Sequence, residues 1–293
     1  MSAEPKFLSY TETPIIPIHS TLLESAKVRL FVKREDLNHE TVSGNKWWKL
    51  KNNLQEALRL KFDRILTYGG AFSNHIYASA AATHELGIQS VGIIRGEPVS
   101  PLNPILHFAS GHGMKLHYLS RADYRKKEDA AEVDKLVSLV GSFYLMPEGG
   151  TNELAITGVE EFASQLPKDF DFICCPVGTG GTLTGLVRGL RGQSKALGFT
   201  VLKGGESWID EVNALRPGYS NWALINDYHF GGYAKTSSVL SDFMDQFTTT
   251  HHVPLEHVYS GKMFYGIFDL LQKGFFRPGC SILALHTGGI HRH

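Results

Sequence analysis

The chain has 293 residues, of which 42% are hydrophobic and 20% are charged. Such a composition is typical of a folded globular protein and excludes a disordered or fibrous one, and the length suffices for one large domain or two smaller ones. Lysine plus arginine and aspartate plus glutamate number 29 each, so no net charge attracts nucleic acid or an acidic membrane surface. We therefore expect a small-molecule partner, with no nucleic-acid or membrane partner.

The first 20 residues contain no basic segment followed by an apolar run, and no stretch approaches the ~20 apolar residues of a spanning helix. This pattern predicts a soluble, cytoplasmic protein. The three cysteines are an odd number, and Cys174 and Cys175 are adjacent in a predicted buried strand, where they are typical of small apolar filler. A reducing compartment fits this usage.

Helices and strands alternate along the first half of the chain. Apolar residues keep helical spacing from Trp47, and a strand ending in glycines is predicted next, at 62–70. Further on, the pattern predicts a helix at 73–87, a strand at 89–96, a helix at 101–113, a strand at 115–120 and a helix at 126–141. Together these elements have the size of a domain.

A second block begins with a predicted helix at 153–166. It continues with a buried strand at 170–178, a glycine loop, a helix at 182–192 and a strand near 199–205. Between Pro217 and Pro254 the pattern is weaker and predicts loops with a short helix. Because parallel strands require crossover connections and bury both faces, we predict an α/β fold with two domains, each a largely parallel twisted sheet with helices on both faces.

The loop at 178–182, in "VGTGGTLTGL", follows the buried strand and opens a helix, so its N–H groups could hold a phosphate. The alternative is a tight strand-to-helix turn without a ligand. No Lys-Ser/Thr pair ends the loop, which excludes a Walker loop. The dinucleotide fingerprint is met at Gly178 and Gly180 but fails where Leu183 replaces its third glycine, so a dinucleotide site is poorly supported.

Lys46 lies at a predicted loop-to-helix junction in "SGNKWWKL". A single lysine is usually a solvated surface group. Together with a phosphate loop and an asparagine-containing turn at 69–75, however, a lysine at such a junction suits pyridoxal phosphate, whose aldehyde forms a Schiff base with an amine.

Six segments together resemble the 1-aminocyclopropane-1-carboxylate deaminase and D-cysteine desulfhydrase family, which belongs to the tryptophan-synthase-β-like (fold type II) pyridoxal-phosphate enzymes. They are "KREDLN…SGNKWWKL", "GGAFSNHIYASAAA", "PEGGTN", "VGTGGTLTGL", "VYSGKMFYGIFDLLQKG" and "LHTGG", and they span residues 33–289. The resemblance implies a smaller domain, residues 48–152, inserted into a larger pyridoxal-phosphate-binding domain of residues 1–47 and 153–293. It also implies a cofactor in the cleft between the domains and a homodimer.

The resemblance assigns Lys46 as the Schiff-base lysine and general base. It implies that Asn74 binds the ring hydroxyl of the cofactor, and that Ser73, Asn74 and His75 offer N–H groups to the substrate carboxylate at a helix N-terminus. Ser73 is also a possible proton acceptor, and a simple helix cap is an alternative for this turn. The phosphate loop comprises Gly178, Thr179, Gly180, Gly181 and Thr182.

Three residues near the C-terminus complete the implied site. Tyr259 matches a tyrosine over the cofactor that acts as an acid, a base or a positioning group, although a packing tyrosine is the commoner role. Thr287 resembles the hydroxyl residue that faces the pyridine nitrogen. Tyr233 matches, in a looser alignment, a second active-site tyrosine that binds substrate.

Departures from the family pattern bear on the substrate. Ser260 follows the key tyrosine where ring-opening deaminases typically have glutamate, which favours β-elimination from a D-amino acid such as D-cysteine. Thr151 and Ala155 replace a serine and a glycine, and relatives continue further past the "HTGG" segment. The predicted reaction converts a small amino acid into a 2-oxo acid and ammonia. The alternatives are cyclopropane ring opening, a binding protein that has lost catalysis, and a nucleotide-dependent α/β enzyme.

Histidines His251, His252, His291 and His293 raise the possibility of a metal site. No further cysteine, aspartate or glutamate spacing completes a ligand set, and adjacent residues of an extended chain point apart. We expect these histidines to be exposed and predict no metal.

Overall fold

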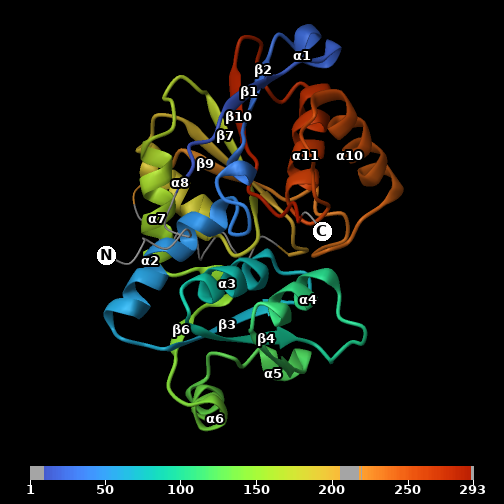
Figure 1. The fold of residues 1–293 in the computed structure, drawn as a ribbon. Coiled ribbons are helices and arrows are strands. Elements are labelled where there is room, and N and C mark those ends of the chain that lie inside the picture. Colours follow the sequence, from blue (N-terminus) through green and yellow to red (C-terminus); the bar gives the residue numbers. More distant parts are fainter. Residues whose placement is uncertain (1–9, 205–217, 219, 292–293) are drawn as a thin grey trace. The chain divides into compact units, whose positions relative to one another are not determined.

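The computed structural model describes residues 10–204, 218 and 220–291. The chain forms two compact units, each with one sheet (Figure 1). The described part of unit 1 comprises Tyr10, His39–Val42 and Lys46–Ala155. Unit 2 comprises Thr11–Asn38, Ser43–Asn45 and the described residues from Ile156 onward.

Unit 2 contains a six-stranded sheet in the order β1-β2-β10-β7-β8-β9. Its strands are β1 (Ile15–Ile18), β2 (Arg29–Lys33), β7 (Phe172–Val177), β8 (Lys195–Thr200), β9 (Trp222–Ile225) and β10 (Ser281–Leu285). Neighbouring strands are parallel, except that the edge strand β1 pairs with β2 in antiparallel fashion. The central strands are buried almost throughout, as a parallel sheet covered on both faces requires.

Helices cover both faces of this sheet (Figure 1). One face carries α7 (Glu153–Ser164) and α8 (Gly181–Leu190), and the other carries α10 (Ser238–His251) and α11 (Ser260–Gln272). The short helix α1 (Thr21–Ala26) packs on α11. The core of this second face joins Leu30, Leu197 and Ile282 of the strands to Phe264 and Ile267 of α11.

Unit 1 contains a four-stranded, fully parallel sheet in the order β5-β4-β3-β6. Its strands are β3 (Arg64–Gly70), β4 (Gln89–Arg95), β5 (Lys115–Leu119) and β6 (Tyr144–Met146). Its helices are α2 (Asn45–Arg59), α3 (Asn74–Glu85), α4 (Pro104–Gly111), α5 (Arg121–Tyr124) and α6 (Ala130–Val140).

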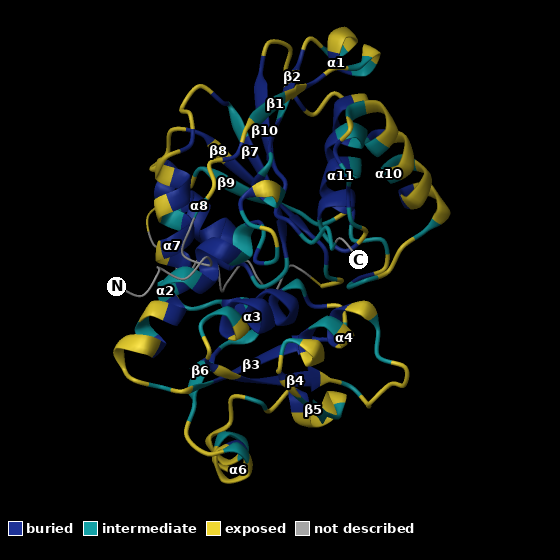
Figure 2. Cartoon of the chain, viewed as in Figure 1, coloured by how far each residue is buried: buried dark blue, intermediate teal, exposed yellow. Residues whose placement is uncertain are grey.

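The two faces of this smaller sheet have separate apolar cores. Ile76 of α3 and Leu106 of α4 pack with Ile94, whereas Tyr124 of α5 and Leu136 of α6 pack in a second cluster with strand residues. In Figure 2 the strands β3 and β4 are coloured as buried, and most of α6 is coloured as exposed. The α6 helix therefore covers its face of the sheet with a narrow apolar stripe.

The predicted fold class is confirmed: each sheet is largely parallel and carries helices on both faces. Two local predictions are wrong. The strand expected near 199–205 lies at Lys195–Thr200, because its hydrogen-bond register follows β7, which ends at Val177. Between Pro217 and Pro254 the structure has β9 and the 14-residue helix α10 instead of loops with a short helix; residues 217 and 219 lie outside the described residues. Leu240, Phe243 and Phe247 have the helical spacing that identifies α10.

Glycines allow α7 and α8 to pack closely in unit 2. A Cβ added at Gly189 would lie 2.5 Å from both the Cβ of Ala163 and the main-chain oxygen of Glu160, and one at Gly185 would lie 2.5 Å from the Cβ of Val159. The two helices thus meet at a distance that admits no side chain on α8 at these positions. This contact fixes α8, the helix that the glycine loop opens.

We predict that Gly189→Ala lowers the free energy of unfolding by about 1–3 kcal/mol, because the added methyl group overlaps the α7 backbone. Gly111→Ala, at the end of α4, is the matched control, since a Cβ there meets no atom within 4 Å. The control should be neutral or stabilising by less than about 1 kcal/mol, as alanine is the better helix former. Urea unfolding followed by circular dichroism measures both, and equal midpoints for the two variants would contradict the packing argument.

Candidate active site

The segment before Lys46 packs directly against the backbone near the C-terminus of unit 2. Gly44 has φ +71°, and a Cβ at this position would overlap the carbonyl group of Thr287. The N–H of Gly44 donates to the main-chain oxygen of Glu35 at 2.9 Å and to Oδ1 of Asn38 at 2.8 Å. Residue 44 must therefore be glycine, both for its left-handed conformation and for the close approach of two backbones.

Asn45 connects this segment to the glycine loop. Its Nδ2 donates to Oγ1 of Thr182 at 2.8 Å, and both residues belong to unit 2. Asn45 is the first residue of α2, and the half-buried Lys46 is the next residue in the chain. The residue before the predicted Schiff-base lysine is thus hydrogen-bonded to the last residue of the predicted phosphate loop.

The glycine loop has the geometry of an anion-binding turn. Strand β7 ends at Val177, Gly180 has φ +76° as the N-cap of α8, and no side chain caps that helix. The N–H groups of the first turn of α8 consequently lack a side-chain acceptor. A Cβ at Gly178 would lie 3.3 Å from the ring of Tyr259, so the close approach of loop and tyrosine leaves little room for a side chain at this position. A phosphate group fits such a turn at the positive end of a helix.

Tyr259 and Tyr233 form an aromatic pair in unit 2, with ring centroids 6.3 Å apart in an edge-on arrangement. Tyr259 is the N-cap of α11. The carboxylate of Glu256 accepts hydrogen bonds from the main-chain N–H groups of residues 258, 259 and 260 at 2.6–2.8 Å, and so holds this helix start in place. Both predicted tyrosines and the glycine loop are therefore brought together in unit 2.

Ser260 is fully buried, and its hydroxyl oxygen accepts the N–H of Glu256 at 3.0 Å. The side chain thus forms part of the turn that precedes α11. Thr287 is also buried, with 8% of its surface exposed, and it follows β10 and His286.

In unit 1, the predicted substrate-binding turn forms the N-terminus of α3. The Oγ of Ser73 accepts the N–H of Ile76 at 3.3 Å, and Asn74 is the first residue of the helix. The helix-cap interpretation of Ser73 is thereby realised. The first N–H groups of α3 lie at its positive end, where a carboxylate is favourable.

The His75 side chain points into the interior of unit 1 and is 1% exposed. The hydroxyl of Thr67 donates its only proton to the main-chain oxygen of Met146 at 2.9 Å, so it accepts the Nε2–H of His75 at 2.8 Å. Its Nδ1 has no hydrogen-bond partner among the described residues, so no group there would accept a second ring proton. Burial, and then the charges of Lys49 and Lys46, hold the pKa of His75 well below its ordinary value.

Lys49 is a buried residue that the sequence analysis missed. Its Nζ donates to Oγ1 of Thr151 at 2.8 Å, and burial followed by the charge of Lys46 lowers its pKa well below the usual range. Spacing i, i+3 places Lys46 and Lys49 on one face of α2, a signal that the sequence contains. The substituted residue Thr151 is thus bonded to the helix that carries Lys46.

The turn at 150–152 is anchored to the same helix. Asn152 and Asn53 exchange side-chain hydrogen bonds at 2.7 and 3.1 Å, and Oδ1 of Asn152 accepts the N–H of Ala155 at the start of α7. Gly150 has φ +67°, and a Cβ there would lie 3.0 Å from the ring of His75. Unit 1 therefore gathers α2, this turn and the start of α3 around the basic residues Lys46, Lys49 and His75.

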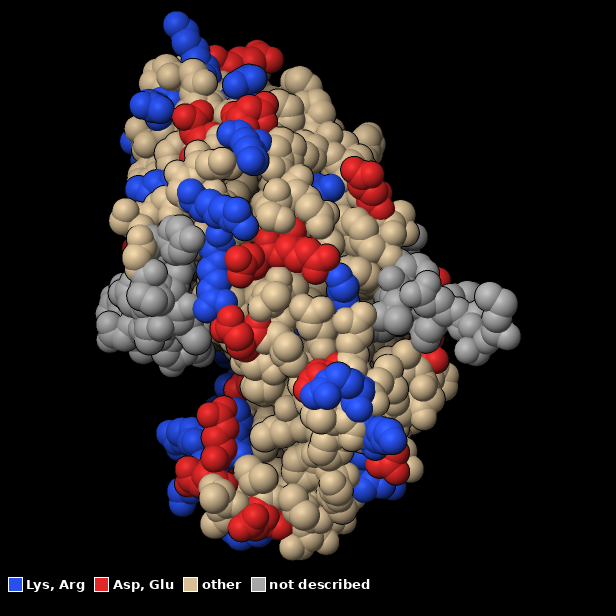
Figure 3. Space-filling view, turned by 90° about the vertical axis from the view of Figure 1, so that its left-hand side faces the viewer, with Lys and Arg blue, Asp and Glu red and all other residues tan. Residues whose placement is uncertain are grey.

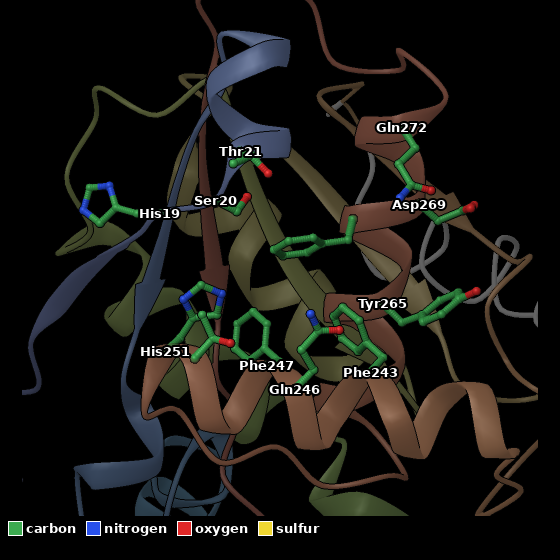
Figure 4. Close-up of a pocket in the computed structure, with 12 residues that line it drawn as sticks. His19, Ser20, Thr21, Phe243, Gln246, Phe247, His251, Tyr265, Asp269 and Gln272 are labelled. Atoms are coloured by element: carbon green, nitrogen blue, oxygen red, sulfur yellow. The ribbon is translucent and has the colours of Figure 1, made fainter.

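A separate cavity of about 440 Å³ lies between α1, α10 and α11 in unit 2 (Figure 4). Figure 4 shows Phe243, Gln246 and Phe247 along α10 on one side of this cavity, with Ser20 and Thr21 on the other. None of the site residues predicted from sequence lines it.

No group of three potential metal-binding side chains occurs in the part of the chain that the structure describes. Of the four histidines considered, His252 is exposed, His251 and His291 are half-buried, and His293 lies outside the described residues. In the described residues, no helix is long and apolar enough to cross a membrane.

We predict that His75 makes stability fall as pH falls. Because its folded-state pKa is depressed, the unfolded chain binds a proton below about pH 6.5 that the folded chain does not. At pH 5.5 this linkage should remove about 1 kcal/mol of the free energy of unfolding relative to pH 7.5. Urea unfolding of the wild type and of His75→Gln at both pH values measures the effect. An equal loss in both proteins would contradict the assignment.

The chain is similar to known proteins over nearly its whole length. Residues 6–288 match the family model described as pyridoxal-phosphate dependent enzyme. A Pyrococcus furiosus protein provisionally named 1-aminocyclopropane-1-carboxylate deaminase is 33% identical, over 95% of this chain and 90% of that protein. The mitochondrial bifunctional D-cysteine desulfhydrase/1-aminocyclopropane-1-carboxylate deaminase of Arabidopsis thaliana is 29% identical, over 94% of this chain and 76% of that protein.

The crystal structure of an ACC deaminase homologue has a TM-score of 0.85 and 28% identity, and the alignment covers 97% of this chain and 91% of that one. The fold and the family match thus extend over nearly the whole chain. The resemblance inferred from the six sequence segments is confirmed: the chain belongs to the pyridoxal-phosphate-dependent enzymes, in the family of the 1-aminocyclopropane-1-carboxylate deaminases and D-cysteine desulfhydrases.

Proposed function

We propose that the protein converts a small amino acid into a 2-oxo acid and ammonia, and that β-elimination from a D-amino acid such as D-cysteine is its main reaction. The observation that carries this proposal is the hydrogen bond between Asn45 and Thr182, which ties the residue before Lys46 to the glycine loop. Relatives named for D-cysteine desulfhydration and for cyclopropane deamination support the same class of reaction.

Pyridoxal phosphate would supply an aldehyde that binds amines covalently and a ring that withdraws electrons from the substrate. The loop Gly178, Thr179, Gly180, Gly181 and Thr182 would hold its phosphate, since the uncapped first turn of α8 offers N–H groups. Lys46 would attach the cofactor. Asn74 would hydrogen-bond the ring hydroxyl of the cofactor, and the hydroxyl of Thr287 would face its ring nitrogen.

The chain's own groups would bind the substrate and move its proton. The N–H groups at the start of α3, from Ser73 to His75, would bind the substrate carboxylate. The imidazole of His75 is bonded to Thr67, so His75 would contribute its main chain only. Lys46 would take the α-proton, with Ser73 or Tyr259 as alternative acceptors. Lys49 and His75 lie beside Lys46 and are hydrogen-bonded to the neutral hydroxyl groups of Thr151 and Thr67.

Ser260 bears on the choice of substrate. Its hydroxyl is buried in the turn before α11, and the carboxylate of Glu256 is already occupied by three main-chain N–H groups. Neither side chain is therefore available as the acid or base that a ring-opening enzyme would place after the key tyrosine. Cyclopropane ring opening is the second candidate function, which the names of the relatives favour.

Two further proposals concern the setting of the enzyme. A homodimer is supported by resemblance to the family, and sedimentation velocity would contradict it by showing a monomer at micromolar concentration.

A cytoplasmic location is supported by the three cysteines, all of them buried free thiols. Recovery of the native protein from a membrane or extracellular fraction would contradict it.

We predict that D-cysteine yields pyruvate with sulfide and ammonia, that D-serine yields pyruvate more slowly, and that the cyclopropane amino acid yields little 2-oxobutyrate. Hydrosulfide leaves more readily than hydroxide, which sets the first two rates. Coupled assays for each keto acid measure all three reactions. Faster release of 2-oxobutyrate than of pyruvate would favour ring opening, and no keto acid from any substrate would favour a binding protein that has lost catalysis.

We also predict that Lys46→Ala abolishes the visible absorbance of the purified protein and lowers turnover by about 10²–10⁴-fold, because it removes both the covalent anchor and the base. Lys51→Ala, on the same helix, is the matched control. Its ammonium lies 5.6 Å from the Trp47 ring, and both absorbance and turnover should persist. If the Lys46→Ala protein kept the visible absorbance, the assignment of this lysine would be wrong. A nucleotide-dependent enzyme would lack this absorbance even in the wild type.

A further inference from the structure

Lys262 is a fully buried lysine that the proposed reaction does not use. It lies in the first turn of α11, and its Nζ donates to the main-chain oxygen of His229 at 2.9 Å and to that of Gly232 at 2.7 Å. Among the described residues, no carboxylate forms an ion pair with it. The ammonium group is therefore held by two carbonyl groups of one loop.

A buried ammonium group held by neutral partners is costly. Burial lowers the pKa of Lys262 to about 8, although the charge of Glu256 acts in the opposite direction. An apolar side chain of similar size would fill the same space without this cost. The two carbonyl groups also accept main-chain N–H groups, from Gly232 at 3.0 Å and from Lys235 at 3.1 Å, so the lysine adds a second donor to each.

The loop held by Lys262 leads directly to Tyr233. Gly231 and Gly232 have φ +90° and +119°, which gives the chain a sharp turn that depends on external bonds for its shape. The next residue is Tyr233, whose ring lies edge-on to Tyr259 at a centroid distance of 6.3 Å. Tyr259 precedes Lys262 by three residues and caps the same helix. The first turn of α11 thus follows Tyr259 directly and, through Lys262, holds the loop that leads to Tyr233.

We propose that Lys262 is a positioning residue that fixes Tyr233 against Tyr259 by holding the carbonyl groups of His229 and Gly232. This inference rests on the proposed function, since only there do the two tyrosines have a role toward substrate and cofactor. A purely structural lysine would stabilise unit 2 without any dependence on Tyr233. The two explanations differ in how mutations at Lys262 and Tyr233 combine.

The kinetic test compares Lys262→Met, Tyr233→Phe and the double variant with the wild type, using the substrate with the highest turnover. Lys262→Met should lower kcat about tenfold or more with a smaller effect on KM, because misplacement of a reacting group affects the chemical step. In the Tyr233→Phe background the same change should lower kcat less than twofold, since the hydroxyl that Lys262 places is already absent. Effects that multiply in the double variant would overturn the proposal.

Lys273→Met is the matched control for the kinetic test. Lys273 is the C-cap of α11, is exposed and is paired with Asp269, far along the helix from Tyr259. Its kcat and KM should stay within twofold of the wild type. If Lys262→Met does not fold, Lys262→Gln replaces it; its side chain is shorter and uncharged, and the same kinetic criteria apply.

Amide hydrogen exchange of the cofactor-free protein tests the loop without any turnover. The amides of Gly232 and Lys235 should exchange at least tenfold faster in Lys262→Met than in the wild type, with unchanged exchange in β7 and β10. Unchanged exchange at both amides would overturn the proposal. A wild type that releases no keto acid would instead refute the proposed function, while the exchange experiment would still decide whether Lys262 holds this loop.

Discussion

The site depends on the close contact between the segment 43–45 and the backbone of Thr287 and Gly288. Gly44 is left-handed and has no space for a Cβ beside the Thr287 carbonyl, and a Cβ at Gly288 would lie 2.8 Å from Oγ of Ser43. Because two backbones touch here, Asn45 is fixed relative to β10 and to the glycine loop within unit 2. The Asn45–Thr182 hydrogen bond then sets where the chain continues into Lys46.

Buried basic groups occur in both units, and neutral oxygens hold them. Lys49 donates to Thr151, the Nε2–H of His75 to Thr67, and Lys262 to two carbonyl groups. A buried carboxylate partner would neutralise each charge, but it would add its own desolvation cost. Neutral acceptors leave positive charge, or a readily neutral amine, in the interior, and such an environment suits an anionic cofactor and an anionic amino-acid substrate.

Much of the fold was predictable because the signals are local. The alternation of helical and strand periods from Trp47 to Leu190 predicts a parallel α/β fold, and the glycine at position 180 predicts the turn that opens α8. The weaker pattern after Pro217 did not predict the full length of α10, although Leu240, Phe243 and Phe247 have helical spacing. The predicted boundaries 1–47, 48–152 and 153–293 stay a prediction; by internal contacts the chain divides near residues 39–46 and 155.

By itself, the sequence determined which residues are candidates for the proposed chemistry: a lysine after Ser-Gly-Asn, an asparagine turn, a glycine loop and two tyrosines, since residue type and neighbours along the chain define such motifs. Only the tertiary structure decided what surrounds them. In the structure, the hydroxyl of Ser260 accepts a main-chain N–H in the turn before α11, and the buried imidazole of His75 is hydrogen-bonded to Thr67. The ammonium of Lys262 donates to the loop that precedes Tyr233. The contacts of His75 and Lys262 join residues from different elements, and their partners depend on packing that no local pattern encodes.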